Sequence, residues 1–230
     1  MIDVRPFDSL GHFENGWLDA HHHFSFGHYN DPARMGFGAL RVWNDDRIAP
    51  GTGFDPHPHR DMEIITYVRE GAITHRDNLG NEGRTEAGDV QVMHAGRGIV
   101  HGEYNREATE TRIFQIWLMP NRVGVDPGWA ARAFPAAGGG LQVLAAGDGR
   151  DGALPLHADG AVLAGRLARG ETIHHALPPG VRAYLVPATG RVTVNGMAVN
   201  TRDGAAIEDE AVLTITADED SEVVLVETTS

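Results

Sequence analysis

Two pairs of metal-ligand side chains stand out in the sequence, each with one residue between its members. His57 and His59 flank Pro58 in "GFDPHPHRDMEIITYV", and His101 and Glu103 lie in "GIVHGEYN". In a β-strand, residues two apart point to the same side and lie about 7 Å apart. Each pair would therefore project two ligands together. His57 and His59 would supply half a coordination sphere, and the later pair an imidazole and a carboxylate.

The spacing alone is weak support for a metal site. With 13 His in 230 residues, chance predicts about one His-x-His and about one His-x-Glu, and the chain holds two of each. The other two pairs are His21/His23 and His12/Glu14. Consecutive histidines in "HHHFSF" alternate across a strand, so only His21 and His23 face together, without an acidic partner. We expect these two histidines to have a supporting or surface role. Phe24 and Phe26 should lie in the core, with the lining of an aromatic substrate pocket as the alternative.

Composition and charge restrict the class of protein. At 230 residues and 41% hydrophobic, the chain can bury one large all-β domain or two smaller domains. The formal net charge of -13 opposes binding to nucleic acid or anionic lipid. No apolar run reaches 18 residues and no charged-then-apolar leader opens the chain, so we expect a soluble, cytoplasmic protein without a membrane partner.

Missing residue types exclude several kinds of catalysis. The chain has no Cys, and all 19 basic residues are Arg. It therefore has no thiolate nucleophile, no lysine Schiff base and no P-loop. The four Ser residues lie outside any G-x-S-x-G turn. The abundant His, Asp and Glu residues point to metal chemistry or to carboxylate acid-base chemistry.

Short β-branched or alternating runs, separated by Gly, Pro, Asn and Asp, predict an all-β barrel or sandwich. These runs cover residues 37–43, 62–68, 89–93, 112–119, 162–167, 181–186, 191–194, 212–216 and 222–227. We predict one short helix, at residues 127–132. The Gly-, Ala- and Pro-rich stretch 119–160 interrupts the strands, and we place the boundary between two domains within it, giving domains 1–135 and 136–230.

The two halves share an outline that indicates an internal duplication. The segments that begin at Gly71 and Gly190 both run through glycine, strand, turn and strand to a Gly/Asp corner. Superposing the two glycines places Ala176 and Pro178 where the first half has its His-x-His pair. We therefore predict a metal-free barrel in the second half.

The residues between the two ligand pairs resemble the paired motifs of the cupin superfamily. The first motif has one residue more than usual before its last glycine. The second has His94 in place of the usual proline and four residues, rather than two, before its histidine. The motifs read Gly51-x5-His57-x-His59-x3-Glu63-x7-Gly71 and Gly88-x5-His94-x-Gly96-x4-His101-x3-Asn105.

A fuller set of segments resembles one family within that superfamily, the pirins. "HPHRDMEI", "HAGRGIVH" followed by x-E, "FQIWLMP", "NGWLDAHHHFSFGHYNDP" and "DGAAIEDE" are similar to pirin sequences, and they span nearly the whole chain. Pirins are bicupins that include bacterial quercetin dioxygenases. The resemblance implies two tandem cupin jelly-roll barrels with a single metal in the first.

The resemblance also implies a ligand set. The pirin pattern makes His57, His59, His101 and Glu103 the metal ligands, whereas the general cupin motif would use Glu63. Residues 57, 59, 61 and 63 would share one face of a continuous strand, so both glutamates fit. Glu63 lies roughly 13 Å beyond His59 along such a strand and would need a bend or bulge to join, which favours Glu103.

The implied function is metal-dependent oxygenation. Three imidazoles and one carboxylate would close a tetrahedral Zn site but leave positions open on Fe(II), Ni, Co, Mn or Cu, and the pirin resemblance favours Fe(II). The expected reaction cleaves the heterocyclic ring of a flavonol such as quercetin by dioxygen, with loss of carbon monoxide. Glu103 or Glu63 would take the substrate proton. The alternative is a non-enzymatic, pirin-like regulator whose metal oxidation state controls binding of a partner protein.

Overall fold

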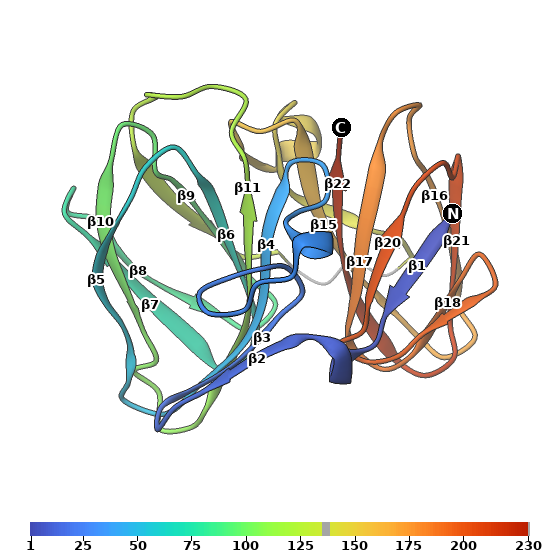
Figure 1. Ribbon diagram of the computed structural model, residues 1–230, viewed down its shortest axis with the longest axis horizontal. Coiled ribbons are helices and arrows are strands. Elements are labelled where there is room, and N and C mark those ends of the chain that lie inside the picture. The colour runs from blue at the N-terminus through green and yellow to red at the C-terminus, as the bar shows by residue number, and fades with distance from the viewer. Residues whose placement is uncertain (135–138, 230) are drawn as a thin grey trace.

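The computed structural model describes residues 1–134 and 139–229 and is built almost entirely of strands. The described part holds three short 3₁₀ turns, η1 (Phe7–Ser9), η2 (Pro32–Arg34) and η3 (Arg150–Gly152). The strands form two similar units, each with a seven-stranded sheet facing a four-stranded sheet. Figure 1 shows the two units side by side. The expected all-β fold with two tandem barrels is confirmed.

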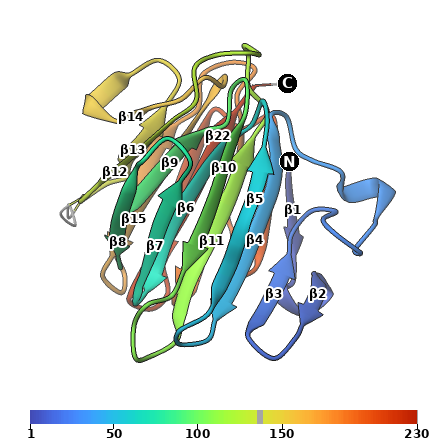
Figure 2. The same ribbon diagram turned by 90° about the vertical axis from the view of Figure 1, so that its left-hand side faces the viewer.

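The first unit carries the residues of the predicted metal site. Its larger sheet contains β2 (Gly11–Glu14), β3 (Leu18–His22), β4 (Leu40–Ile48), β6 (Glu63–Glu70), β9 (Val90–His94), β11 (Thr111–Leu118) and β12 (Gly128–Arg132), in the order β12-β9-β6-β11-β4-β3-β2. Its smaller sheet contains β5 (Gly53–His59), β7 (Ala72–Asp77), β8 (Glu82–Glu86) and β10 (Ile99–Tyr104), in the order β5-β10-β7-β8. Figure 2 views the molecule from the side of this unit.

The second unit repeats the plan. Its larger sheet contains β1 (Ile2–Arg5), β13 (Gln142–Ala146), β14 (Leu154–Pro155), β15 (Gly160–Leu167), β17 (Arg182–Thr189), β20 (Gly204–Ile207) and β22 (Ser221–Thr228), in the order β1-β20-β17-β22-β15-β13-β14. Its smaller sheet contains β16 (Thr172–Ala176), β18 (Val192–Val194), β19 (Met197–Val199) and β21 (Val212–Ala217), in the order β16-β21-β18-β19.

Gly71 and Gly190 occupy equivalent corners of the two units. Both have positive φ, 75° and 70°. A Cβ atom at Gly71 would collide with Thr111, the first residue of β11. A Cβ atom at Gly190 would collide with Ser221, the first residue of β22. Only glycine satisfies both conditions, since an L side chain would be strained and would clash. The same corner in both units supports the duplication inferred from the sequence.

The chain crosses between the units at its beginning. Strand β1 pairs with β20 of the second unit, although it opens the chain. The proposed boundary between residues 135 and 136 lies outside the described residues. The short helix predicted at 127–132 is wrong: this segment is strand β12, paired with β9 in an antiparallel register. Pairing with the free edge of β9 overrides the weak local preference of so short a segment.

The two barrel interiors differ in content. A large core between the two seven-stranded sheets joins the units and includes Trp43, Phe114 and Tyr184. The second barrel is filled by one continuous cluster of aliphatic side chains. In the described part of the first barrel, the apolar side chains form two small clusters, one around Ile113 and one around Met93, and polar side chains lie between them. The first barrel therefore has a polar interior that can hold a site.

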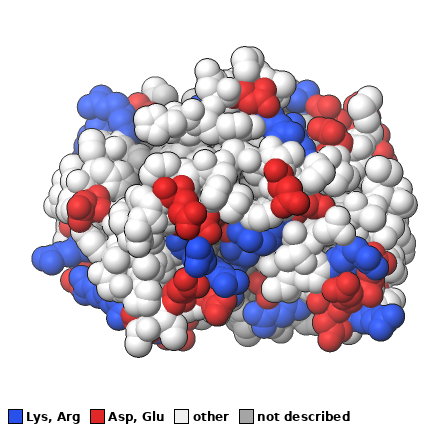
Figure 3. Space-filling model, turned by 60° about the horizontal axis from the view of Figure 1, so that its bottom comes forward, with Lys and Arg blue, Asp and Glu red and all other residues white. Residues whose placement is uncertain are grey.

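The surface shows no large region of one charge on the face drawn in Figure 3, where Arg side chains alternate with Asp and Glu. Several charged groups of the protein form ion pairs, such as Arg47 with Asp19 and Glu110. Among the described residues, no helix has the length and apolar character needed to cross a membrane.

Candidate metal centre

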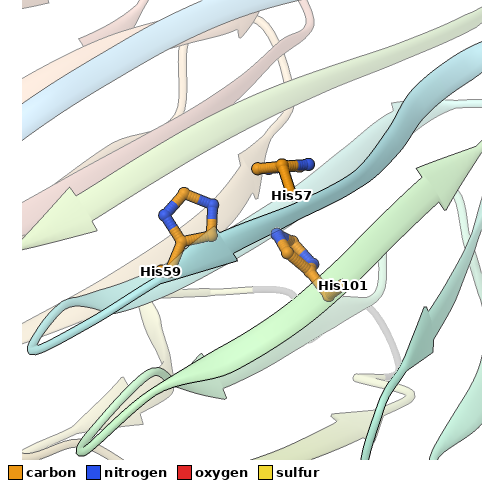
Figure 4. A group of neighbouring side chains, drawn as sticks. All are labelled: His57, His59 and His101. Atoms are coloured by element: carbon orange, nitrogen blue, oxygen red, sulfur yellow. The ribbon is translucent and has the colours of Figure 1, made fainter.

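Three histidines converge inside the first barrel. His57 and His59 project from β5 and His101 from the neighbouring strand β10, where His101 is the register partner of His57. One nitrogen atom from each ring lies within 4.8 Å of the other two. Figure 4 shows the three rings gathered on the same side of the two strands. The structure thus brings together three of the ligands expected from the sequence.

The hydrogen bonds of these rings leave lone pairs for a metal ion. Nε2 of His59 and Nε2 of His101 are buried and have no hydrogen-bond partner among the described residues. Nδ1 of His57 donates to the Asp55 carbonyl oxygen at 2.7 Å, which leaves its Nε2 free to coordinate. Buried nitrogen atoms without partners are costly and rare, so the donor set fits a divalent metal ion.

Burial favours the neutral form of His59 and of His101. Burial, together with the neighbouring His101 and His57, lowers the pKa of His59 to about 4. Burial, with the nearby His57 and His75, lowers the pKa of His101 to about 3. Neutral imidazole is the form that binds metal, so these rings need no deprotonation at neutral pH.

Glu103 lies at the same cavity but has partners of its own. Its buried carboxylate accepts hydrogen bonds from Thr66 Oγ1 at 3.1 Å, Gln91 Nε2 at 2.5 Å and Gln115 Nε2 at 2.9 Å. It is not part of the group whose ligand atoms lie within 4.8 Å of one another. The three donors come from the opposite sheet, so Glu103 links the two walls of the barrel.

A bulge in β5 contributes to this arrangement. Opposite β10, His57 pairs with His101 but Phe54 pairs with Glu103, so β5 has one extra residue in this interval. In a regular strand every second side chain points inward. The extra residue shifts this alternation by one position, so that an even-numbered residue before the bulge points to the same side as the odd-numbered residues after it. Phe54 as well as His57 and His59 therefore lines the cavity.

A row of polar side chains on the larger sheet faces the histidines. Its members are consecutive register partners across five strands, and each is buried: Gln91, Thr66, Gln115, Asn44 and His22. Nδ1 of His22 lies 2.8 Å from Oδ1 of Asn44. Sequence reasoning missed this row. Its only signal was a polar residue among the inward positions of each strand.

Glu63 lies elsewhere, and the continuous strand expected from residue 57 to 63 is wrong. The chain turns after His59, where Asp61 has φ 47°, and Glu63 begins β6 in the opposite sheet. The Glu63 carboxylate lies 2.5 Å from Nδ1 of His94 and accepts a hydrogen bond from the backbone N–H of His157 at 2.9 Å. Glu63 therefore joins the two units and does not line the cavity.

The cavity beside the histidines has a volume of about 780 Å³. That size is typical of sites for small organic ligands. Aromatic side chains form much of its wall, and Phe26 and Trp117 contact each other edge to face at 5.5 Å. These lining aromatic residues are Phe13, Trp17, Phe26, Tyr29, Phe54 and Trp117. Phe24 is fully buried in the core as expected, whereas Phe26 lines the cavity and the prediction that it lies in the core is wrong.

A second group of ligand-type side chains lies on the outside of the β2-β3 hairpin. His12 Nε2 lies 2.8 Å and His21 Nδ1 3.7 Å from Oδ1 of Asp19, so His21 does have an acidic partner, contrary to our expectation. The two rings are stacked 4.4 Å apart at 19°, and nearly parallel rings do not aim their nitrogen atoms at one point. Arg47 also binds Asp19. We interpret the group as an ion-pair network.

Comparisons with known proteins agree with the geometry. Residues 3–118 match the model of the Pirin family, and residues 143–228 match that of the quercetinase C-terminal cupin domain. A putative quercetin 2,3-dioxygenase of Pseudomonas aeruginosa is 62% identical, with 99% of each chain covered. The quercetin 2,3-dioxygenase of Escherichia coli is 46% identical over 98% of this chain and 97% of its own.

A solved structure shows the same fold with a metal. The bacterial pirin YhhW from Escherichia coli, in complex with nickel(II), superposes with a TM-score of 0.94 at 45% identity, covering 100% of this chain and 99% of its own. Quercetin 2,3-dioxygenase from Acinetobacter baumannii superposes with a TM-score of 0.76 at 22% identity, with 99% of this chain and 88% of that chain covered, which indicates the fold alone. The two tandem cupin barrels are thereby confirmed.

Proposed function

The chain belongs to the pirin family, and we propose that it is a metal-dependent dioxygenase that cleaves the heterocyclic ring of flavonols such as quercetin with release of carbon monoxide. One observation carries the proposal. The unpartnered Nε2 atoms of His59 and His101 lie beside a cavity of about 780 Å³ with aromatic walls. This combination suits a metal ion that meets a flat aromatic substrate.

We assign metal binding to His57, His59, His101 and Glu103. Burial lowers the pKa values of His59 and His101 and so favours their neutral, metal-binding form, and Glu103 adds a carboxylate at the same cavity. A bound divalent transition metal would polarise the 3-hydroxyl and carbonyl oxygens of the flavonol and mediate electron flow to dioxygen. Fe(II) is the metal expected from the sequence, and the similar bacterial pirin in complex with nickel(II) makes Ni the second choice.

The remaining residues bind the substrate and handle its proton. Phe26 and Trp117 provide aromatic surface beside His59, whose ring meets Trp117 edge to face at 5.0 Å. The Glu103 carboxylate takes the proton of the 3-hydroxyl, a role for which Glu63 is not placed, since it contacts His94 and His157. Thr66, Gln91 and Gln115 hold Glu103 in position for this transfer.

The test compares two ligands that differ in one hydroxyl group. Metal-loaded protein should shift the absorption of quercetin to the red and then consume oxygen and quercetin with evolution of carbon monoxide. Luteolin lacks the 3-hydroxyl and should neither shift nor react. His59→Ala should abolish turnover. Binding of quercetin without oxygen consumption would refute the dioxygenase.

The regulatory alternative gains no support from the relatives named above, which are described as dioxygenases or as a pirin. The flavonol-sized cavity also favours a small-molecule ligand over a role confined to the protein surface.

A further inference from the structure

Two adjacent acidic residues of β4 point to opposite faces of the larger sheet and have opposite surroundings. Asp45 faces the second unit, and its carboxylate binds Arg69 of β6 and, at 2.5 Å, Arg202 of the second unit. Asp46 faces the cavity of the first barrel. It is 3% exposed, and its Oδ1 atom is buried without a hydrogen-bond partner among the described residues.

The register of the sheet shows where Asp46 lies relative to the metal centre. Its partners on the two neighbouring strands are Ile113 and Ala20, both apolar. Asn44 and Gln115 form the row two residues away, and Gln115 binds Glu103. Asp46 is therefore about 7 Å beyond the Glu103 row along the strand.

Asp46 lies on the side of that row away from the histidines. Trp117, which contacts His59, is two residues from Gln115 in one direction, and Ile113, the partner of Asp46, is two residues away in the other. At the Asp46 end the cavity is walled by Leu18, Trp17 and Phe54, and Trp17 and Phe54 meet edge to face at 5.2 Å. A single carboxyl group is thus set in an apolar end of the cavity.

A buried carboxyl oxygen that lacks a hydrogen-bond partner in apolar surroundings destabilises the folded protein. Such an atom in the wall of a cavity indicates a ligand that hydrogen-bonds to it. Burial, and next the charges of Asp45 and Glu103, raise the pKa of Asp46 well above its ordinary value. This shift favours the protonated acid. It can both donate a hydrogen bond and accept one, as a phenolic hydroxyl requires.

We propose that Asp46 is a substrate-recognition residue that hydrogen-bonds a hydroxyl group on the aromatic ring system remote from the metal-chelating oxygens. The proposal rests on the proposed function, because it takes the ligand to be a flavonol held at the histidines. It adds a requirement that chelation alone does not impose: the substrate is polyhydroxylated, with a hydroxyl that reaches the Trp17 and Phe54 end of the cavity.

The experiment pairs quercetin with 3-hydroxyflavone. Both carry the chelating 3-hydroxyl and carbonyl, but 3-hydroxyflavone has no other hydroxyl group. Dissociation constants are measured from the absorption shift on metal-loaded protein without oxygen. Wild type should prefer quercetin, and Asp46→Leu should reduce that preference about tenfold, the size expected for one buried hydrogen bond. Binding of 3-hydroxyflavone should be unchanged or tighter.

Two further variants separate recognition from structure. Asp46→Asn keeps a donor and an acceptor and should retain most of the preference. Asp45→Asn removes the neighbouring negative charge on the opposite face, and with it the ion pairs to Arg69 and Arg202, and should leave the preference unchanged. The melting temperature of Asp46→Leu should equal or exceed that of wild type, because it removes a buried oxygen atom that has no hydrogen-bond partner in the described part of the chain. Asp46→Ala provides a second measurement if the leucine variant does not fold.

An unchanged preference in Asp46→Leu or Asp46→Ala would overturn the proposal, as would a wild type that binds the two flavonols equally or binds neither. The dioxygenase itself is tested separately by admitting oxygen to the bound complex. If quercetin binds but is not consumed, the proposed function fails while the affinity ratio still decides the role of Asp46.

Discussion

Nδ1 of His101 lies 3.4 Å from Nδ1 of His75, and Nε2 of His75 lies 3.0 Å from Oδ2 of Asp77. The Asp77 carboxylate is an acceptor, so His75 carries its proton on Nε2 and offers Nδ1 as the acceptor for His101. This leaves the Nε2 lone pair of His101 directed at the candidate metal centre. His75 is fully buried and stacks on Trp129 at 4.9 Å and 7°. His75 and Asp77 lie between the two sequence motifs and belong to neither.

Replacing His75 tests whether this chain orients His101. His75→Phe keeps an aromatic ring against Trp129 but removes the acceptor for His101. We expect metal affinity, measured by competition with a chelator, to fall about 10- to 100-fold, the usual effect of removing the hydrogen-bond partner of a metal ligand.

His57→Ala and His101→Ala, which remove proposed ligands, should lose the metal while keeping the circular dichroism spectrum of the folded protein. Unchanged affinity in His75→Phe would argue against the orienting role.

The two buried glutamates should respond differently to the same substitution. In Glu103→Gln, an amide NH₂ would meet the donors of Gln91, Gln115 and Thr66, and a charged ligand would be lost. Metal content should fall and turnover should cease. Glu63→Gln should keep the metal but lower the urea midpoint, because Glu63 binds His94 and the His157 backbone across the units. Metal loss in Glu63→Gln alone would reverse the assignment.

Acidification should destabilise the metal-free protein as the pH falls from about 6.5 toward 4. Burial, together with the charges of His12 and Arg202, lowers the pKa of His21 to about 4. Burial also lowers the pKa of His23 well below its ordinary value. Unfolded histidines take up protons near pH 6.5, which the folded protein resists, so the unfolded state gains as protons are added. The urea concentration at the unfolding midpoint should be highest at pH 7.5, lower at pH 6 and lowest at pH 5.

His23→Asn provides the control for the pH dependence. Nδ1 of His23 lies 2.9 Å from the Tyr184 hydroxyl, a contact that the Asn side chain can replace without titrating in this range. The urea midpoint should therefore decrease less in this variant than in wild type as the pH falls. Equal declines in the variant and in wild type would show that His23 does not contribute.

A chain that ends at Phe134 should be insoluble, even though it contains the whole candidate metal centre. It would expose the core between the two larger sheets, where the ring centroids of Trp43 and Tyr184 lie 5.6 Å apart. It would also leave β1 without β20. Exposed apolar surface of this extent leads to aggregation. A soluble fragment that binds metal would contradict this expectation.

The fold was predictable because its main signal is local. Alternation of side chains every two residues is visible in any short window, and the strands duly formed where such runs occur. Residues 127–132 have no strong pattern, and pairing with β9 decided their structure as β12. The single turn at Asp61 had a larger effect, because it moved Glu63 from the histidine strand to the opposite sheet.

By itself, the sequence determined the all-β class and the spacing that puts His57 and His59 on one side of a strand and makes His101 and Glu103 a second pair. Only the tertiary structure decided what surrounds them. Thr66, Gln91 and Gln115 reach Glu103, and Asp46 reaches the cavity, because distant strands face one another when the barrel closes. Strand order and register depend on long-range hydrogen bonding and packing, and these leave no periodic mark in the sequence.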